Sequence, residues 1–216
     1  MAKNKKELGS IFQEGVEQWI DKRLVRPSSI FHEMEMLAEK EFIPILSPQA
    51  GAVLAFLVKT AKPNNVLELG TGLGYSIAWM VSTGLELNIT TVDRNETSIE
   101  RAKTYLTKIQ NQTKIDYING DCLEFVQDSN RNSEYDFVFV DCDKVTYPEI
   151  LMKLISSMKK NSILVFDNVL WHGRLNPEIH TRPSDKAIHE FWNYIDSLTN
   201  ERILFPAGDG ILQIVL

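Results

Sequence analysis

The feature that most constrains the fold is an apolar run, Val66–Leu69, followed by glycines at alternate positions, Gly70, Gly72 and Gly74. The apolar run predicts a strand that is buried on both faces, and the residues from Tyr75 to Ser82 have helical spacing. Glycine is needed where φ is positive or where a ligand touches the backbone. Strand, glycine turn and helix together predict the first unit of a nucleotide-type site.

The glycine spacing discriminates between nucleotide ligands. A dinucleotide site requires G-x-G-x-x-G, whereas the sixth position counted from Gly70 is Tyr75, so the third glycine of that pattern is missing. The observed G-x-G-x-G suits a ligand without a pyrophosphate to place on a helix N-terminus. Glu68, an acidic residue within the strand, suits a positively charged ligand, and S-adenosylmethionine carries a sulfonium and an ammonium. An NAD-dependent oxidoreductase is the disfavoured alternative.

An acidic residue ends the second predicted strand. Asp93 follows Ile89–Val92, about twenty residues beyond the glycine turn, where a carboxylate can accept hydrogen bonds from ribose hydroxyls. The simpler interpretation is a polar residue that begins a loop. After this glycine turn, ribose binding is the favoured interpretation.

Strand and helix patterns alternate along the rest of the chain, which predicts a parallel sheet covered on both faces, with ligands at the carboxyl ends of the strands. Strands are predicted at Val66–Leu69, Ile89–Val92, Ile115–Ile118, Phe137–Val140, Ile163–Phe166, Arg202–Phe205 and Ile211–Val215, the last two as an antiparallel hairpin. Helices are predicted at Ile11–Leu24, Ile30–Lys40, Gln49–Thr60, Tyr75–Ser82, Glu96–Gln110, Asp121–Asp128, Tyr147–Met158 and Ser184–Leu198. We expect a single domain over residues 1–216, with residues 1–60 as an N-terminal helical cap.

Length and composition set outer limits. The 216 residues suffice for one domain with a full core, and the net charge of −6 argues mildly against a large nucleic-acid footprint. Cys122 and Cys142 are too few for a disulfide framework, and Cys142 is interpreted as a small packing residue. The sequence shows neither a secretory signal nor a long apolar run, so a cytoplasmic enzyme is the expected setting.

Polar residues follow the later strands. Asp141 and Asp167, each directly after a strand, are expected to converge, because neighbouring strands lie about 4.8 Å apart, and Asn168 adds a neutral carbonyl. Such an all-oxygen set suits Mg²⁺, or Mn²⁺ or Ca²⁺; the alternative is that both aspartates only cap the following loops. Lys144 is close enough in sequence to share this site. Asp121, after the third strand, is interpreted as a helix cap, an adenine contact or both.

Four motifs resemble the cation-dependent O-methyltransferases, the family of caffeoyl-CoA and catechol O-methyltransferases and their bacterial relatives. The motifs are Leu67–Ser76, Phe139–Lys144, Asp167–Gly173 and Pro206–Gly210, and they occur in the family's order. The resemblance runs from about the second helix to the C-terminus. It implies a Rossmann-like class I methyltransferase fold with a mostly parallel seven-stranded sheet, and a homodimer. Cys142 departs from the family pattern, where alanine is usual.

The resemblance also implies residue roles. The implied metal ligands are Asp141, Asp167 and Asn168, and the implied catalytic residues are Lys144 and Asp141. The predicted cofactor-binding residues are Leu46, Glu68, Gly70, Gly72, Ser76, Asp93, Asp121 and Asp141. The inferred reaction is direct methyl transfer from S-adenosylmethionine to an oxygen held by a divalent cation. Lys144 acts either as a neutral base or as a charged group that stabilises the developing oxyanion.

The methyl acceptor stays open between a small hydroxylated aromatic molecule with vicinal oxygens and tRNA. One bacterial branch of the family methylates wobble 5-hydroxyuridine in tRNA, and the layout of this chain is similar to that branch. Trp171, Tyr147 and the loop His172–Pro183 are expected to line the acceptor pocket. The basic residues of that loop suggest either an anionic partner, such as CoA or RNA phosphate, or a polar surface loop; they are His172, Arg174, His180 and Arg182.

Overall fold

The computed structural model describes residues 15–109 and 112–216 and contains a seven-stranded sheet in the order β3-β2-β1-β4-β5-β7-β6. The strands are β1 Asn65–Leu69, β2 Asn88–Asp93, β3 Lys114–Asn119, β4 Phe137–Val140, β5 Ile163–Phe166, β6 Arg202–Phe205 and β7 Ile211–Val215. The first five strands are parallel to one another, and β7 is antiparallel to both β5 and β6. The predicted mixed sheet with an antiparallel C-terminal pair is confirmed.

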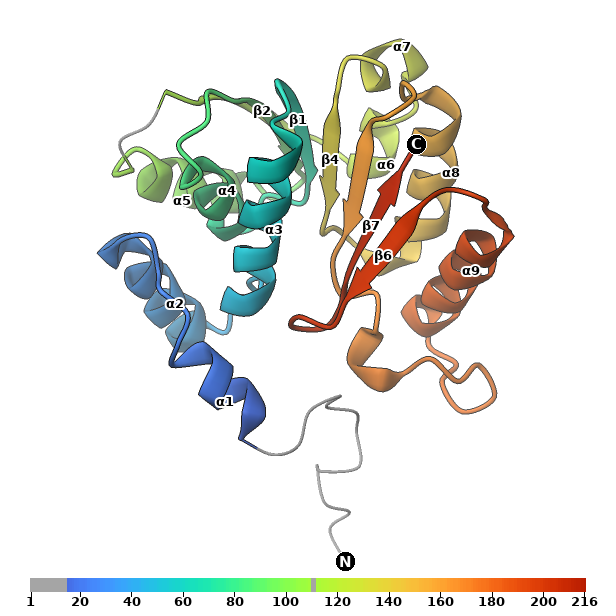
Figure 1. The fold of residues 1–216 in the computed structure, drawn as a ribbon, viewed down its shortest axis with the longest axis horizontal. Helices are drawn as coiled ribbons and strands as arrows, with labels where there is room; N and C mark the ends of the chain where they lie inside the picture. The colour runs from blue at the N-terminus through green and yellow to red at the C-terminus, as the bar shows by residue number, and fades with distance from the viewer. Residues whose placement is uncertain (1–14, 110–111) are drawn as a thin grey trace, which may run out of the picture.

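Helices flank the sheet (Figure 1). They are α1 Val16–Asp21, α2 Ser29–Glu41, α3 Pro48–Ala61, α4 Tyr75–Val81, α5 Glu96–Leu106, α6 Cys122–Phe125, α7 Ser129–Asn132, α8 Tyr147–Ser157 and α9 Pro183–Ser197, with 3-10 turns η2 Lys144–Thr146 and η3 Trp171–Gly173. Within the described residues, none of these helices is long and apolar enough to cross a membrane. The predicted helix over Asp121–Asp128 is too long: α6 ends at Phe125, and a second short helix, α7, begins only at Ser129.

Each face of the sheet carries its own hydrophobic core, because successive side chains of a strand point to opposite faces. Phe137 and Phe139 of β4 pack with the core formed by α2, α3, α4 and α5. Val138 and Val140 of the same strand pack with the core formed by α8 and α9. All four β4 residues are buried, as expected for a central parallel strand.

The direction of winding reverses between β1 and β4. From β1 the chain proceeds to β2 and β3 on one side, whereas β4 and β5 lie on the other side. Such a switch point leaves a crevice beyond the carboxyl ends of the two central strands. Backbone hydrogen bonds draw the two strand ends together, since the Asp141 amide donates to the Leu69 carbonyl at 2.8 Å. The fold therefore opens its crevice directly beside the glycine turn.

The N-terminal helices lie beside the sheet's α3–α4 side (Figure 1). Gly51 of α3 packs directly on Trp79 of α4, since a Cβ at Gly51 would lie 2.2 Å from the indole Nε1. Arg26 joins α1 to α2 through Asp21 at 2.7 Å and Glu35 at 3.0 Å. The predicted first helix, Ile11–Leu24, begins outside the described residues, and the cap assignment for residues 1–60 stays a prediction.

Candidate active site

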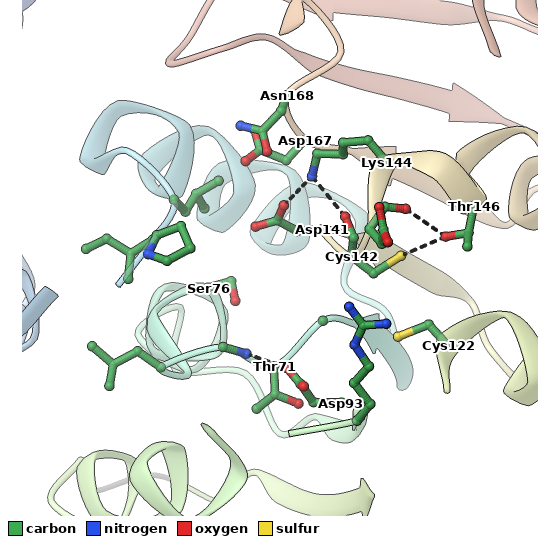
Figure 2. A pocket seen from close by; sticks show the side chains of 18 of the residues that line it. Thr71, Ser76, Asp93, Cys122, Asp141, Cys142, Lys144, Thr146, Asp167 and Asn168 are labelled. Carbon is green, nitrogen blue, oxygen red and sulfur yellow. Dashed lines mark hydrogen bonds and ion pairs between the residues drawn. The ribbon is translucent and has the colours of Figure 1, made fainter. Parts of the chain in front are cut away.

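A cavity of about 670 Å³ lies at the switch point, beyond the carboxyl ends of the central strands. Its lining includes the predicted site residues Leu46, Gly70, Gly72, Ser76, Asp93, Asp121, Asp141, Lys144, Asp167 and Asn168. Figure 2 shows Asp141, Asp167 and Asn168 together on one side, around the Lys144 ammonium. Of the predicted catalytic, cofactor-binding and metal-binding residues, all of which are described, only Glu68 is absent from the lining.

The three glycines of the turn serve different purposes, although all have positive φ, 104° at Gly70, 51° at Gly72 and 78° at Gly74. A Cβ at Gly70 would lie 2.2 Å from the Asp141 carbonyl oxygen, and one at Gly74 would lie 2.9 Å from the Ala102 Cβ. These two glycines are required by the packing of the protein itself. No heavy atom of the described residues lies within 4 Å of a Cβ built on Gly72, which lines the cavity. Gly72 is therefore the point where a ligand can approach the backbone.

Asp93 holds the glycine turn in place. Its Oδ2 accepts a hydrogen bond from the Gly72 amide at 3.0 Å, and its Oδ1 accepts one from the Asn95 amide at 2.8 Å. Asp93 is the last residue of β2, and its side chain orders the loop that follows, which leaves the choice between the two interpretations open. Its carboxylate also faces the cavity, and the ribose contact stays a prediction.

Glu68 lies behind the cavity wall and is fully buried. Its carboxyl group accepts hydrogen bonds from the hydroxyls of Ser76 and Thr91. Burial raises the pKa of Glu68 to about 8, which outweighs the opposite effect of these hydrogen bonds. Ser76 stands between Glu68 and the cavity, so the predicted cofactor contact of Glu68 is indirect in this structure and stays a prediction.

Asp121 caps helix α6. Its Oδ1 accepts hydrogen bonds from the amides of Leu123 at 2.8 Å and Glu124 at 3.0 Å, which satisfies the first free N–H groups of the helix. The capping interpretation is confirmed. The residue also lines the cavity, so the adenine contact stays open as a prediction.

The two aspartates after β4 and β5 meet around Lys144. The Lys144 Nζ donates to the Asp141 Oδ1 at 2.7 Å, and the lysine is 7% exposed. Asp167 is buried, and its Oδ1 has no hydrogen-bond partner among the described residues. Burial raises the pKa of Asp167 well above its usual range, and the nearby charge of Asp141 raises it further. Without a cation, this corner therefore favours the protonated form of the Asp167 carboxyl beside the Asp141–Lys144 pair.

The chemistry of this corner fits a divalent cation. Asp141, Asp167 and Asn168 present carboxylate and amide oxygens, the ligand type that hard cations prefer. The unpartnered Asp167 Oδ1 is a buried acceptor that a cation would satisfy. Within the described residues, no group of three or more His, Cys, Asp or Glu side chains is arranged to bind a metal, since the third member here is an asparagine. The metal site stays a prediction.

A family model described as O-methyltransferase matches residues 26–215. The chain belongs to this O-methyltransferase family. The resemblance to the cation-dependent members is confirmed at family level, and the chain is an S-adenosylmethionine-dependent O-methyltransferase. The caffeoyl-CoA O-methyltransferase of Stellaria longipes is 32% identical over 177 residues, covering 78% of this chain and 73% of that protein. The tapetum-specific methyltransferase 1 of Arabidopsis thaliana is 33% identical over 147 residues, covering 64% and 63%.

Solved structures share the fold. The Bacillus cereus O-methyltransferase, solved in complex with SAH, superposes with a TM-score of 0.77 at 22% identity, covering 94% of this chain and 97% of that one. The O-methyltransferase TomG from Streptomyces achromogenes, solved in complex with SAM, gives a TM-score of 0.78 at 20% identity, covering 95% and 99%. The predicted Rossmann-like methyltransferase fold is confirmed.

One residue of this O-methyltransferase that sequence reasoning missed is Asp209, in the turn between β6 and β7. Its Oδ1 accepts a hydrogen bond from the His172 amide at 2.7 Å, and its Oδ2 lies 3.3 Å from the His172 Nδ1. Its carbonyl accepts from the Leu170 amide at 2.9 Å. Asp209 therefore fastens the segment that carries Asn168 and Trp171 to the hairpin. The only signal in the sequence was its place in the Pro206–Gly210 motif.

The acceptor side of the enzyme differs from the sequence prediction in two respects. Tyr147 was expected to line the pocket, but it is fully buried beneath it, and its hydroxyl donates to the carbonyls of Val140 and Asp167 at 2.9 and 3.0 Å. It braces the two strand ends instead. Of the predicted loop His172–Pro183, only His172 lines the cavity.

Arg174 forms an ion pair with Asp185 within the protein. Its guanidinium donates to both carboxyl oxygens of Asp185, at 2.8 and 2.6 Å. The same carboxylate accepts from the Trp171 indole at 2.8 Å. These hydrogen bonds hold the pKa of Asp185 below its usual range, and the bond from Arg174 has the largest effect. The interpretation of Arg174 as an anion-binding residue is thus weakened, and Trp171 becomes a pocket residue with a fixed ring.

Proposed function

We propose that this enzyme methylates a hydroxyl of a small aromatic molecule with two adjacent oxygens, and that it needs a divalent cation to do so. The observation that carries the proposal is one cavity that holds both the glycine turn and the Asp141–Asp167 pair. Relatives named caffeoyl-CoA O-methyltransferases support an acceptor of this class. Trp171 lines the same cavity, and its aromatic face suits a flat ring.

In this proposal the cation is held by Asp141, Asp167 and Asn168. When bound, a divalent cation lowers the pKa of a coordinated hydroxyl and fixes its direction. The protein contributes the oxygens and their placement: the buried Tyr147 hydroxyl fixes the two strand ends from which Asp141 and Asp167 project. This support lies outside the cavity, so it is in place before any ligand binds.

The opposite side of the cavity would hold the methyl donor. Gly70, Gly72 and Ser76 would lie against the methionine and ribose portions, Asp93 would accept from the ribose hydroxyls, and Leu46 and Asp121 complete the proposed contact set. One cavity would hold donor and acceptor in line. In model reactions, such proximity lowers the activation free energy by up to roughly 7–11 kcal/mol.

Lys144 lies beside the carboxyl oxygens of Asp141 and Asp167 on the acceptor side of the cavity. Its ammonium is hydrogen-bonded to Asp141 and to the Cys142 carbonyl at 3.2 Å, so the side chain has a fixed position. In one role it takes the acceptor's proton as a neutral base, and in the other it stays charged and stabilises the developing oxyanion. Both roles place its Nζ near the reacting oxygen.

The second candidate acceptor is wobble 5-hydroxyuridine in tRNA, favoured by the similarity of the chain's layout to that bacterial branch. The net charge of −6 and the pairing of Arg174 with Asp185 favour the small molecule instead. A homodimer, as the resemblance implies, is part of the proposal and is testable by light scattering.

A methyl-transfer assay on catechols, caffeoyl-CoA and hydroxyuridine-containing tRNA, run side by side, tests the proposal. We expect transfer to one of the small molecules, and loss of transfer with a chelator that is reversed by Mg²⁺. Transfer to tRNA alone would establish the second candidate. Transfer that is unaffected by the chelator would overturn the metal requirement. Calorimetry with S-adenosylmethionine and NAD checks the donor independently of the acceptor.

A further inference from the structure

We propose that Cys122 and Cys142 form an oxidation-sensitive thiol pair in the wall of the cavity, and that closure of their disulfide and binding of the methyl donor exclude each other. The inference rests on one part of the proposed function, namely that the methyl donor binds in this cavity. It concerns the chain's only two cysteines, both of which are free thiols.

The two thiols come from separate parts of the fold. Cys122 begins α6 after β3, and Cys142 follows β4, while β2 and β1 lie between these strands in the sheet. Both side chains nevertheless line the same cavity and are partly exposed. Figure 2 shows both sulfur atoms on the same side of the cavity. In the reduced protein the Cys142 thiol lies 3.7 Å from the Thr146 hydroxyl, and both cysteines lie beside Gly70.

The pair lies directly beside the first glycine of the turn. The Cys122 thiol donates to the Val92 carbonyl at 3.5 Å, and the same carbonyl accepts from the Gly70 amide at 2.9 Å. On the other side, the Cys142 backbone nitrogen would lie 3.1 Å from a Cβ at Gly70. Any movement of either cysteine is therefore transmitted to the turn that faces the donor.

Disulfide closure requires such a movement. A disulfide has an S–S distance of about 2.05 Å, which is much shorter than the contact distance of two free thiols. Cys122 follows Asp121, and Cys142 follows Asp141, so drawing the sulfurs together displaces two carboxylates that line the cavity. Helix α6 has only four residues and offers little resistance. The oxidised cavity is thus a poorer site for the donor.

The oxidant in this proposal is a peroxide. One thiolate attacks a peroxide oxygen, the O–O bond breaks, and the products are a sulfenic acid and, after protonation of the leaving hydroxide, water. The second thiol then attacks the sulfenic sulfur, which forms the S–S bond and releases a second water. Overall the two thiols lose two electrons and two hydrogens, and the peroxide is reduced to two waters. A small dithiol reverses the reaction by exchange.

Two measurements on the full chain test the proposal. After treatment with hydrogen peroxide, intact mass should fall by two hydrogen atoms, and both free thiols should disappear together. Calorimetry should then show S-adenosylhomocysteine binding at least about tenfold more weakly than to the reduced protein, within the range typical of coupled sites. Reduction with dithiothreitol should restore the affinity. Because coupling is reciprocal, saturating S-adenosylhomocysteine should slow disulfide formation.

The matched variants are Cys122→Ala and Cys142→Ala, each of which keeps one thiol and cannot close. In either variant, peroxide should leave the affinity within about twofold of that variant's own reduced form. An oxidised wild type without the disulfide would overturn the thiol pair. A wild type with the disulfide and unchanged affinity would overturn the exclusion, and neither result would touch the donor site. A reduced wild type that does not bind S-adenosylhomocysteine would instead overturn the donor site, and the exclusion with it.

Discussion

Burial changes the chemistry of single side chains at this site, and Glu68 is the clearest case. The carboxyl is enclosed behind the glycine turn, and burial raises its pKa from 4.5 to about 8. Between these values the folded protein holds a proton that the unfolded chain has released. The stabilising contribution is therefore complete below pH 4.5 and is lost as the pH rises towards about 8.

Glu68→Gln, a neutral residue of the same shape, removes this titration. In the ligand-free protein, the free energy of unfolding should fall more steeply with rising pH in the wild type than in the variant. Across this window the difference between the two slopes should reach about 1.4 kcal/mol per pH unit. Urea unfolding of both proteins across the window measures the difference. The exposed Glu178→Gln is the control and should keep the wild-type slope. Equal slopes for wild type and Glu68→Gln would contradict the prediction.

Lys144 is the second residue whose surroundings predict a measurable role. Lys144→Met keeps the length of the side chain over the Tyr147 ring but removes the ammonium. We expect kcat to fall by about 10²- to 10⁴-fold while affinity for S-adenosylhomocysteine stays near that of the wild type. Steady-state kinetics and calorimetry separate the two effects. Near-normal turnover would exclude both roles of the lysine.

Lys144→Arg distinguishes the two roles, because an arginine keeps the charge but does not act as a neutral base. Activity well above that of Lys144→Met indicates charge stabilisation, whereas equal loss in both variants indicates proton transfer.

At the scale of secondary structure, the strands were predicted well because their signals are local. Phe137–Val140 and Ile163–Phe166 are short apolar runs bounded by polar residues, and they form strands with these bounds. The helix predicted over Asp121–Asp128 failed for a physical reason. Asp128, like Asp121, accepts hydrogen bonds from amides at a helix start, so each aspartate begins its own short helix.

Side-chain direction was harder to predict than position. Every predicted catalytic, cofactor-binding and metal-binding residue except Glu68 lines the cavity, because the carboxyl ends of parallel strands converge at one edge. Tyr147 was misplaced because sequence spacing does not show whether an aromatic residue at a helix start points into a cavity or beneath it. Asp209 was missed because its partner, His172, is distant in sequence and meets it only in the fold.

Gly72 and Gly84 both need a positive φ, but we expect only Gly72, in the glycine turn, to affect ligand binding. Gly72 and Gly84 have φ of 51° and 75°, and a Cβ at either meets no heavy atom of the described residues within 4 Å. Alanine at each position should therefore fold, at a cost of about 1–2 kcal/mol for the left-handed conformation. Only Gly72→Ala places a methyl group in the cavity wall. Calorimetry should show lost affinity for S-adenosylhomocysteine in Gly72→Ala and unchanged affinity in Gly84→Ala; equal affinities would contradict this interpretation of the turn.

The hairpin between β6 and β7 predicts a separate effect on the acceptor. Asp209→Ala removes the carboxylate that holds the His172 amide, so the segment with Asn168 and Trp171 loses a tether. We expect KM for the acceptor to rise by roughly tenfold, the equivalent of about 1.4 kcal/mol from a charge-assisted hydrogen bond, with donor affinity unchanged. Asp209→Asn keeps an acceptor oxygen and should recover most of the loss. A change in donor affinity alone would contradict the proposed tether.

Across the whole molecule, the sheet and its two cores act as a frame that holds two carboxyl groups close together. Asp141 and Asp167 end adjacent strands of a fully packed region, and the Tyr147 hydroxyl ties their backbones to one buried point. Because the strands are buried on both faces, these carboxylates have little freedom to separate. The fold therefore disfavours the ionised form of Asp167, which lowers stability at neutral pH, and a cation bound between the carboxylates should remove this cost.

Added Mg²⁺ should accordingly stabilise the whole domain. At a concentration about 100-fold above its Kd, a ligand that binds only the folded state contributes about 2.7 kcal/mol, which corresponds to a rise in Tm of about 5–10 °C for a chain of this size. Asp167→Asn should lose this rise, and it should raise the Tm of the metal-free protein because it removes a buried carboxyl whose ionised form the fold disfavours. Asp143→Asn removes a carboxylate from the same cavity but not from the proposed ligand set, so it should keep the rise. Thermal unfolding with and without Mg²⁺ measures all three, and an equal rise in Asp167→Asn would show that Mg²⁺ acts elsewhere on the molecule.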